Sequence, residues 1–559
     1  MTDTPHTLRS LFEAAVQAEP RHHIFAEWYE KKAWQQRTYA ETWDRIRTLS
    51  EWFGVNGLRP GISRTAIILP NSPQWVELYL AIVGLNGTVV PIDPKLTPPE
   101  IHHILEDSEA TLLATDPAHL PTIAALSPAL PQLQRILLTE AAPTPEGLTI
   151  PVDTIEEALT AIAPDASLRF WDDPAYQPTP DSVCGILYTS GTTGKPKGAM
   201  LTHHNFVTDA LGSLDTIQLD VTPDDAFLTV LPLFHAFSFT ANFLIAVVRH
   251  SRLLYIRSLR TLSDDMKHLQ PTVLMSVPLM AEKLADRLLS KARETWTGKF
   301  LLACFPKCVG KRMIDALGGR LRLIIVGGAK CSPTLLRQFK RLGIPAGEGY
   351  GLTECAPIIS LCPPSMNKIG SVGPAITGLE ARIHKPDAQG VGELQVRGPQ
   401  VFKGYWNRPD ATDETFSGDW LRTGDLASMD FDGFITIRGR AKALIVNREG
   451  KNIYPEEVEQ AIARNPLIGA VVVLAYHSKD EPGERVGALV SPNDEYVSRV
   501  YPDITPEALC EKLRTAVKHQ CESLAAYKHP RKIEVSLQPL ERTSTQKVRR
   551  GVYAGTLDE

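Results

Sequence analysis

A run of hydroxyl, glycine and lysine residues follows an apolar segment in the middle of the chain, in the sequence ILYTSGTTGKPKGA from Ile186 to Ala199. Hydroxyls, exposed backbone N–H groups and two ammonium groups converge there on one short loop, a combination that suits a polyphosphate. The loop differs from a Walker loop, because only two residues separate Gly191 from Gly194 and Pro196 stands where Ser or Thr would hold magnesium. A P-loop NTPase is therefore disfavoured, and an ordinary solvated loop is a weaker explanation of so long a string.

Five further short motifs follow this loop. They are GGA at Gly327 to Ala329, GYGLTE at Gly349 to Glu354, TGD at Thr423 to Asp425, GRAK at Gly439 to Lys442, and TSTQK ending at Lys547. Together with TSGTTGKPKG they resemble the ordered motifs of the AMP-forming acyl- and aryl-CoA synthetases, peptide-synthetase adenylation domains and firefly luciferases. The resemblance covers nearly the whole chain, and six ordered motifs are far more specific than any one of them.

The resemblance implies a binding site for ATP and AMP. Its residues would be Thr189, Ser190, Gly191, Thr192, Thr193, Gly194, Lys195, Lys197, Gly328, Ala329, Gly349, Tyr350, Gly351, Thr353, Asp425, Ile437, Arg440 and Lys547. Among them Tyr350 offers an aromatic face to a base, and Asp425 resembles the carboxylate that accepts both ribose hydroxyls in the family. Arg440 resembles the family's second nucleotide contact, with Ile437 near the sugar or base. Read alone, the Gly-Asp turn would more often be structural, and the arginine an exposed side chain after a strand.

Catalysis would rest on Thr353, Glu354 and Lys547. Glu354 is expected to be the magnesium ligand, since a hard cation bound with phosphates takes carboxylate oxygen. Lys547 lies in the basic run RTSTQKVRR, whose default interpretation is a solvated tail. In the family this lysine bridges the substrate carboxylate and the α-phosphate, which offsets their repulsion. Gln546 stands where many relatives have glycine, so the resemblance leaves the local loop geometry open.

Two further positions would serve a second step. Lys442 falls where the family has the hinge about which its small C-terminal domain rotates. The segment REGKN, from Arg448 to Asn452, resembles the loop that this rotation brings to the thiol channel. Gly450 matches the family's glycine there, whereas Lys451 departs from the more usual small residue.

The segment LPLFHAF, from Leu231 to Phe237, resembles the one that begins the acyl pocket in the family. Peptide synthetases usually carry an aspartate there for the substrate amine, and this chain has His235. Phe234 and Phe237 flank it in an apolar, aromatic neighbourhood that favours a hydrocarbon chain. Packed core is the more ordinary interpretation of any single aromatic here. The later string VNREGKNIYPEEVE is most similar to medium- and long-chain fatty acyl-CoA synthetases.

The implied reaction consumes MgATP and a fatty acid, releases pyrophosphate, and transfers the acyl group from acyl-AMP to CoA. Its cofactors and substrates would be ATP, Mg²⁺ and CoA, and its partners a fatty acid and either CoA or an acyl carrier protein. A ligase that loads an acyl carrier protein, or a fatty acyl-AMP ligase, shares every motif. A luciferase would need oxygen chemistry that no feature specifies. A non-catalytic nucleotide-binding protein would be expected to lack Glu354 or Lys547.

Short runs of branched apolar residues alternate with helical patterns, which predicts an α/β fold. Expected strands are Thr65 to Leu69, Val183 to Tyr188, Thr272 to Val277 and Arg322 to Val326, and expected helices are Trp75 to Leu85 and Pro333 to Leu342. A hairpin is expected around Asp432-Gly433, followed by a compact α+β unit. The resemblance implies a large domain of αβ-layered sheets with a β-barrel-like subdomain at residues 1–438, a hinge at 439–442 and a small mobile domain at 443–559.

Composition narrows the function classes. The 59 Lys and Arg residues nearly balance the 64 Asp and Glu residues, a formal charge of −5 that disfavours a dedicated nucleic-acid binder. Eight cysteines without a CxxC pair favour reduced thiols, and the N-terminal residues do not resemble a signal peptide. We therefore expect a cytoplasmic protein. Ala226 to Val248 lacks charged residues and is interpreted as a buried strand, loop and helix. The basic and aromatic stretch Lys283 to Arg312 leaves peripheral membrane contact open beside the favoured interpretation of a solvated face.

Overall fold

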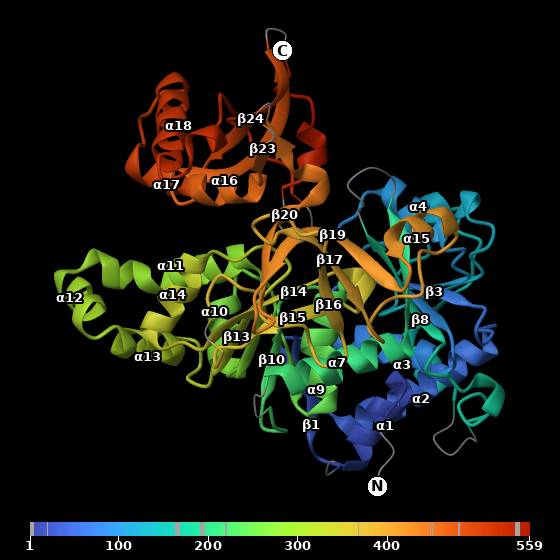
Figure 1. The fold of residues 1–559 in the computed structure, drawn as a ribbon. Coiled ribbons are helices and arrows are strands. Elements are labelled where there is room, and N and C mark those ends of the chain that lie inside the picture. The colour runs from blue at the N-terminus through green and yellow to red at the C-terminus, as the bar shows by residue number, and fades with distance from the viewer. Residues whose placement is uncertain are drawn as a thin grey trace. The chain divides into compact units, whose positions relative to one another are not determined.

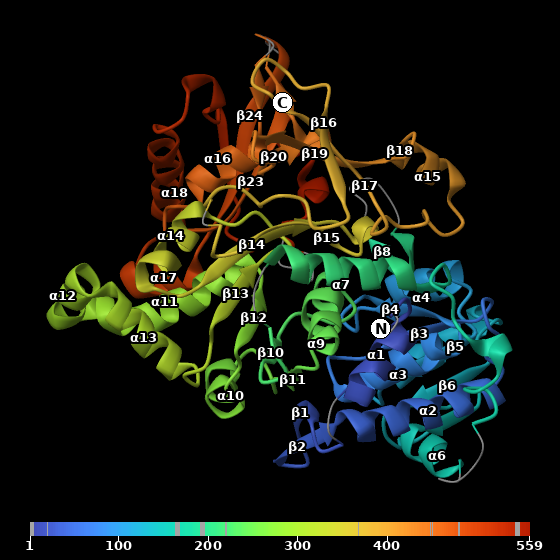
Figure 2. The ribbon, with the colours of Figure 1, turned by 60° about the horizontal axis from the view of Figure 1, so that its bottom comes forward.

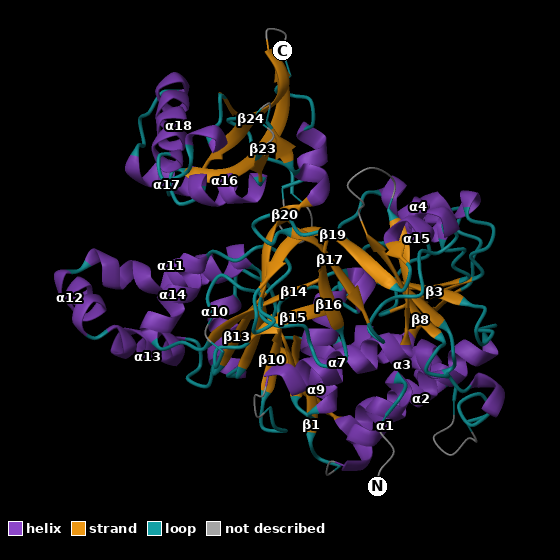
Figure 3. Ribbon diagram, viewed as in Figure 1, coloured by secondary structure: helices purple, strands orange, loops and turns teal. Residues whose placement is uncertain are grey.

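The computed structural model describes residues 5–558 except 19–20, 163–167, 190–195, 218–220, 367, 448, 450, 479–480 and 543–547. These residues form two compact units. Unit 1 comprises residues 1–380 and 396–421, and unit 2 comprises residues 381–395 and 422–559. Unit 1 contains both helices and strands, drawn purple and orange in Figure 3.

The first sheet of unit 1 has seven strands in the order β7-β6-β5-β3-β4-β8-β9. They are β3 (Arg64–Ile68), β4 (Thr88–Ile92), β5 (Leu112–Thr115), β6 (Arg135–Leu138), β7 (Val152–Thr154), β8 (Val183–Thr189) and β9 (Lys197–Thr202). All pairs are parallel except the last, in which β9 returns antiparallel to β8. Apolar residues of β3 to β6 are buried together with residues of helices α4 (Pro98–Asp107) and α5 (Leu120–Leu126), as expected for a sheet covered by crossover helices.

The second sheet has eight strands in the order β15-β14-β13-β12-β10-β11-β1-β2. They are β1 (Ile24–Glu30), β2 (Ala33–Thr38), β10 (Ala226–Thr229), β11 (Arg252–Tyr255), β12 (Val273–Ser276), β13 (Leu323–Val326), β14 (Ala346–Gly351) and β15 (Ile358–Cys362). The strands from β14 to β1 in this order are parallel, and β15 and β2 are antiparallel to their neighbours. Parallel strands share one carboxyl edge, so the segments that follow β10, β12, β13 and β14 meet there.

The helices of unit 1, many of which lie against its two sheets, can be followed in Figures 1 and 2. They are α1 (Leu8–Ala18), α2 (Tyr39–Val55), α3 (Pro73–Gly84), α4 (Pro98–Asp107), α5 (Leu120–Leu126), α6 (Ile155–Thr160), α7 (His203–Ile217), α8 (Ala236–Ser238), α9 (Ile245–Val248), α10 (Leu262–Leu269), α11 (Pro278–Glu294), α12 (Trp296–Cys304), α13 (Pro306–Ala316), α14 (Pro333–Leu342) and α15 (Pro409–Thr415), with a π-helical turn η3 (Phe239–Leu244) and a 3₁₀ turn η4 (Thr353–Cys355). Their ends follow local chemistry. Thr38 and Glu41 form a capping box at the start of α2, and Gly343, with φ of 72°, ends α14.

Unit 2 is an α+β arrangement. It contains β21 (Ile445–Val446), β22 (Asn452–Ile453), α16 (Pro455–Ile462), β23 (Ile468–Ser478), β24 (Glu481–Pro492), α17 (Asp494–Val500), α18 (Pro506–Cys521) and β25 (Lys532–Val535). Strand β24 pairs antiparallel with β23 and parallel with β25, and one buried cluster joins these strands to α16 and α18.

Residues 380–440 form a five-stranded sheet, and the expected β-barrel-like subdomain stays a prediction. The order of this sheet is β16-β17-β19-β18, with β20 paired to β19. The strands are β16 (Glu380–His384), β17 (Gly392–Arg397), β18 (Phe416–Ser417), β19 (Trp420–Met429) and β20 (Ile435–Arg440).

The structure confirms the strands and helices predicted from the sequence, each within two residues at its start, including the hairpin at Asp432-Gly433. Ala226 to Val248 forms β10, a loop, and the consecutive turns α8, η3 and α9. Within the described part of the chain, none of the helices has both the length and the apolar character needed to span a bilayer. The division into units follows packing and does not test a pivot, so the boundary at 438/439 and the hinge at 439–442 stay predictions.

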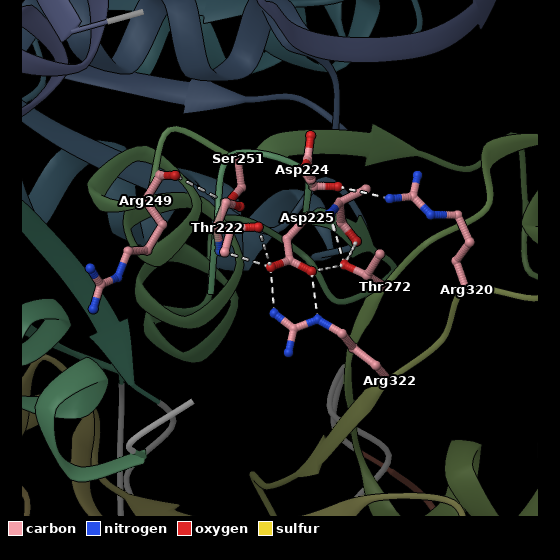
Figure 4. A network of polar contacts seen from close by, with 9 residues as sticks. Thr222, Asp224, Asp225, Arg249, Ser251, Thr272, Arg320 and Arg322 are labelled. Atoms are coloured by element: carbon pink, nitrogen blue, oxygen red, sulfur yellow. Dashed lines mark hydrogen bonds and ion pairs between the residues drawn. The ribbon is translucent and has the colours of Figure 1, made fainter. Parts of the chain in front are cut away.

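A polar network ties together the amino ends of the parallel strands in the second sheet (Figure 4). Asp225, directly before β10, accepts hydrogen bonds from Arg322 Nε at 2.8 Å and from Thr272 Oγ1 at 2.6 Å. Its second oxygen accepts one from the backbone N–H of Thr222 at 2.8 Å and pairs with the Arg322 guanidinium. Burial pushes the pKa of Asp225 upward, but these donors outweigh burial and hold the pKa below its ordinary value of 3.8.

Asp225→Asn is expected to lower the stability of the protein by about 2–4 kcal/mol, since hydrogen bonds to charged groups each contribute roughly 1.5–3 kcal/mol and Arg322 is partly solvated. Because the folded-state pKa is depressed, this stabilisation is fully present above about pH 4 and is lost only as the pH falls through the folded value. Urea unfolding at pH 7 and pH 5 should show the same loss. The neighbouring exposed Asp224→Asn is the control, and a deficit that differs between the two pH values would contradict the assignment.

Candidate active site

Glu354 lies in turn η4, just beyond the end of β14, and its carboxylate is held by an aromatic residue from a distant segment. Tyr405 Oη donates a hydrogen bond to Glu354 Oε1 at 2.7 Å, and the backbone N–H of Phe402 donates to the Glu354 carbonyl at 2.9 Å. Lys197 Nζ lies 5.4 Å from the centre of the Tyr405 ring. The predicted nucleotide residue Lys197 and the predicted magnesium ligand Glu354 thus meet at Tyr405.

Tyr405 was not predicted from the sequence. Its segment pairs with β9, since Tyr405 bridges to Ala199 and the backbone N–H of Trp406 donates to the Gly198 carbonyl at 2.8 Å. The one available signal was an aromatic pair after Gly404, which is common in packed turns. Only the tertiary pairing distinguishes it.

The turn after Glu354 is fixed by buried polar groups that were likewise not predicted. Asp209 of α7 accepts a hydrogen bond from the Ile358 N–H at 3.2 Å, and Thr240 Oγ1 donates to the Ala356 carbonyl at 2.6 Å. Burial raises the pKa of Asp209 well above its ordinary range, although the Ile358 N–H opposes this. Gly351 must lack a side chain, because a Cβ there would lie 1.9 Å from the Pro357 carbonyl oxygen. The backbone that carries Thr353 and Glu354 is therefore rigidly placed.

The GGA motif follows β13 and lies beside both β14 and the predicted acyl segment. A Cβ on Gly327 would lie 3.0 Å from Phe237 Cζ and 3.3 Å from the Gly349 carbonyl oxygen. Gly328 has a φ of 76°, which favours glycine, and Ala329 follows it. The GGA motif therefore lies between Phe237 and the Gly349 backbone at the carboxyl edge of the sheet.

Glu348, the residue before Gly349, is buried beside the segment that follows the GGA motif. Its Oε1 accepts a hydrogen bond from the Cys331 N–H at 3.2 Å. Burial raises the pKa of Glu348 to about 7, opposed by the Cys331 N–H and by Lys330. The contact ties the segment after the GGA motif to β14.

The predicted acyl segment is anchored by Asn71, which follows β3. Asn71 Nδ2 donates to the Leu231 carbonyl at 2.8 Å, and its Oδ1 accepts from the Leu233 N–H at 2.8 Å. The rings of Phe234 and His235 lie 4.6 Å apart. Both are partly exposed, as is Phe237.

Two other aromatics of this neighbourhood, Phe239 and Phe243, are buried core residues. Phe239 packs on Phe206 and Tyr79. For these two the ordinary interpretation as packed core is correct.

Thr189 and Lys197 lie on either side of the part of the phosphate-loop motif that is outside the described residues. They pair across the antiparallel strands β8 and β9. The motif therefore connects strand to strand, unlike a Walker loop, which leads into a helix. Ser190, Gly191, Thr192, Thr193, Gly194 and Lys195 lie outside the described residues.

In unit 2 the predicted ribose contact and its neighbour form an ion pair. Asp425 and Arg440 are opposite each other in the β19–β20 register, with Arg440 Nε 3.0 Å from Asp425 Oδ1. Arg440 also donates to the Thr423 carbonyl at 3.2 Å, and the Asp425 N–H donates to Thr423 Oγ1 at 3.1 Å. Asp425 is buried, and Ile437 lies in the same hairpin opposite Ala427. The Asp425 carboxylate, the predicted acceptor of the ribose hydroxyls, thus pairs with Arg440 across the hairpin.

The residues predicted for the second step lie partly outside the described residues. Lys442 is exposed in a 3₁₀ turn, Ala441–Ala443. Lys451 Nζ lies 3.2 Å from Glu449 Oε2 and 4.7 Å from the centre of the Tyr527 ring. Gly450 and Lys547 are not among the described residues. Their roles stay predictions.

Glu354 fits a magnesium ligand by the chemistry of its surroundings. Its carboxylate is half-buried and one oxygen is oriented by Tyr405. Magnesium in nucleotide sites commonly takes one or two carboxylates and completes its shell with phosphate oxygens and water.

Unit 1 has an α/β fold in which the GGA and GYGLTE motifs of the predicted nucleotide site lie at the carboxyl ends of parallel strands in the second sheet. Residues 12–406 match the family model described as AMP-binding enzyme. The chain belongs to this family, which confirms the resemblance seen in its motifs.

Curated relatives include the long-chain-fatty-acid–CoA ligase FadD15 of Mycobacterium bovis, 31% identical over 83% of this chain and 78% of the relative. The feruloyl-CoA synthase of an Amycolatopsis species is 31% identical over 92% of both chains. Among solved structures, the o-succinylbenzoate CoA synthetase MenE of Bacillus subtilis in complex with ATP and magnesium is 26% identical, covers 97% of this chain and 98% of its own, and gives a TM-score of 0.73. These matched proteins are CoA ligases and synthases that act on different acids.

Proposed function

We propose that this protein is an AMP-forming ligase that activates a medium- or long-chain fatty acid and transfers its acyl group to CoA. The observation that carries the proposal is the close approach of both the Phe237 ring and the Gly349 carbonyl to one residue, Gly327 of the GGA motif. It supports an apolar segment beside the GGA motif and the end of β14, both of which belong to the predicted nucleotide site. A fatty acid whose hydrocarbon chain lies along the apolar segment would present its carboxylate to the phosphates of a bound nucleotide.

The first step is an in-line displacement. The fatty acid carboxylate attacks the α-phosphorus of ATP, a new P–O bond forms, and pyrophosphate leaves with the electron pair of the broken P–O bond. Lys197 and Lys547 offset the negative charges, and Tyr350 faces the base. Magnesium, held by Glu354 together with phosphate oxygens, would neutralise charge on the transferring and leaving phosphates.

The second step transfers the acyl group. The CoA thiolate attacks the carbonyl carbon of acyl-AMP, and AMP leaves as the C–O bond breaks. Rotation about Lys442 would withdraw Lys547 and bring the segment with Gly450 and Lys451 to the thiol. Asp425 would hold the ribose hydroxyls in both steps, with Arg440 beside it.

The acid and the acceptor each have a second candidate. An aromatic acid is favoured by the similarity to feruloyl-CoA synthase. An acyl carrier protein would serve as acceptor with the same residues.

Unbranched fatty acids of eight or more carbons are expected to give the highest kcat/KM among carboxylic acids, because each additional buried CH₂ contributes about 0.8 kcal/mol. Pyrophosphate release should be measured with acetate, octanoate, palmitate, ferulate and an amino acid, with CoA or holo carrier protein as acceptor. Faster turnover of ferulate would replace the fatty acid by an aromatic acid, and faster turnover of acetate or an amino acid would contradict the apolar pocket. Thioester formed only on carrier protein would change the acceptor.

A further inference from the structure

Helices α11, α12 and α13 form a helical arm of unit 1. In both Figure 1 and Figure 2, α12 lies at its end, away from the strands of the second sheet. The inner face of the arm is apolar. Val309 and Met313 of α13 are buried in one cluster with residues of β10, β12, β13 and α14. The arm is therefore a packed part of the fold whose far end projects outward.

Three large aromatic side chains face solvent at this end. Trp296 is 79% exposed, Phe300 50% and Phe305 52%. The Trp296 and Phe300 rings stack with centroids 6.1 Å apart, and those of Phe300 and Phe305 lie 6.4 Å apart. Single exposed apolar residues are common on protein surfaces, whereas contiguous exposed apolar groups such as these three rings favour an interaction surface.

The periodicity of α12 explains the exposure. Trp296 and Phe300 are one helical turn apart and share a face, while Gly298 is buried and Leu301 and Leu302 pack toward the core. Thr295 caps the helix by accepting a hydrogen bond from the Gly298 N–H at 3.1 Å. The helix is thus fixed with its aromatic face outward.

Basic residues accompany the aromatic group. Lys299, Lys307 and Lys311 are exposed, and no Asp or Glu occurs from Thr295 to Ile314. The whole chain carries a formal charge of −5, so this segment is locally opposite in sign to the average surface. We name the set Trp296, Lys299, Phe300, Phe305, Lys307 and Lys311 the aromatic-basic patch.

We propose that the aromatic-basic patch docks the protein on the surface of a bilayer that contains anionic lipid. Lysines attract anionic headgroups over about a Debye length, and tryptophan and phenylalanine rings insert between headgroups and acyl chains. An acidic protein would satisfy the lysines but gives no reason for three exposed rings. A second copy of the chain, with its formal charge of −5, could also pair with the lysines. Self-association is therefore tested below. Docking is independent of which acid the enzyme uses.

The test is co-sedimentation of the full chain with vesicles of phosphatidylcholine alone or with about 30% phosphatidylglycerol. We expect binding to the anionic vesicles that is at least about tenfold stronger than to neutral ones and that weakens in high salt. Lys299→Glu with Lys307→Glu should abolish it, whereas the exposed pair Lys31→Glu with Lys32→Glu should not. Trp296→Ser with Phe300→Ser should weaken binding even at low salt, and Phe431→Ser, at a fully exposed position of unit 2, is the matched control.

Thermal unfolding midpoints equal to that of the parent protein establish that the variants fold. The proposal is overturned if the parent protein does not bind anionic vesicles at low salt, or if both patch variants bind as the controls do. It is also overturned if sedimentation velocity shows that the patch variants only abolish self-association, or if an acidic carrier protein binds the patch while vesicles do not.

Discussion

Replacing Lys547 with alanine is expected to reduce acyl-AMP formation by about 10²–10³-fold, the range typical for loss of one donor that stabilises charge in the transition state. The lysine is assigned to the first step alone. The same variant, supplied with preformed acyl-AMP and CoA, should therefore still produce thioester. Rapid-quench measurement of each half-reaction distinguishes the two. Lys518→Ala, an exposed lysine of unit 2, is the matched control and should leave both rates unchanged.

Lys442 is expected to give the opposite pattern. Lys442→Pro fixes φ near −65° at the predicted pivot, so rotation between the two steps is obstructed while the first pose stays accessible. Acyl-AMP should accumulate without thioester. Lys442→Ala removes the same side chain but leaves φ free, and it should retain most of the second step. Equal loss of both half-reactions in Lys547→Ala and Lys442→Pro would contradict the assignment of these lysines to separate steps.

The sequence predicted those parts of the fold that local chemistry determines. The run from Arg322 to Val326 is short, branched and apolar, and it forms β13. Pro333 and Gly343 border a periodic segment, and α14 begins and ends there. The π-helical turn η3 was not predicted, because the apolar sequence around Phe239 specifies burial but not which backbone hydrogen bonds form. Its Thr240 hydroxyl donates to the distant Ala356 carbonyl, a contact that the local sequence does not specify.

The residues of the candidate site that belong to a sequence motif were predictable. Those that join the site only through tertiary contacts were not. Glu354 belongs to a motif, but Tyr405, which orients it, lies 51 residues away and contributes through a hydrogen bond that sequence spacing does not encode. Asp209 accepts a hydrogen bond from the N–H of Ile358, which is 149 residues away in the sequence. Without this contact, nothing distinguishes it from other aspartates in helices. The resemblance supplied roles for Lys547 and Gly450 that these contacts do not test.

The Glu354–Tyr405 contact predicts that variants of the two residues differ in how strongly they impair magnesium use. Glu354→Gln removes one anionic oxygen from the predicted metal, so the apparent Mg²⁺ requirement should rise and acyl-AMP formation should fall by about 10²-fold. Tyr405→Phe keeps the ring beside Lys197 but deletes the hydroxyl that orients the carboxylate. Loss of such an orienting partner typically costs about 10–100-fold in metal affinity or activity, so this variant should lie between Glu354→Gln and the parent.

Magnesium titrations of acyl-AMP formation at saturating ATP separate metal binding from general damage. Both variants should shift the Mg²⁺ midpoint upward, and excess Mg²⁺ should restore Tyr405→Phe more fully than Glu354→Gln, because only the former retains the ligand. Glu380→Gln, at an exposed glutamate paired with Arg397, should leave the midpoint unchanged. If Glu354→Gln lowered the rate without moving the midpoint, another group would hold the metal, and Glu354 with its Tyr405 contact would serve only to position the turn after β14.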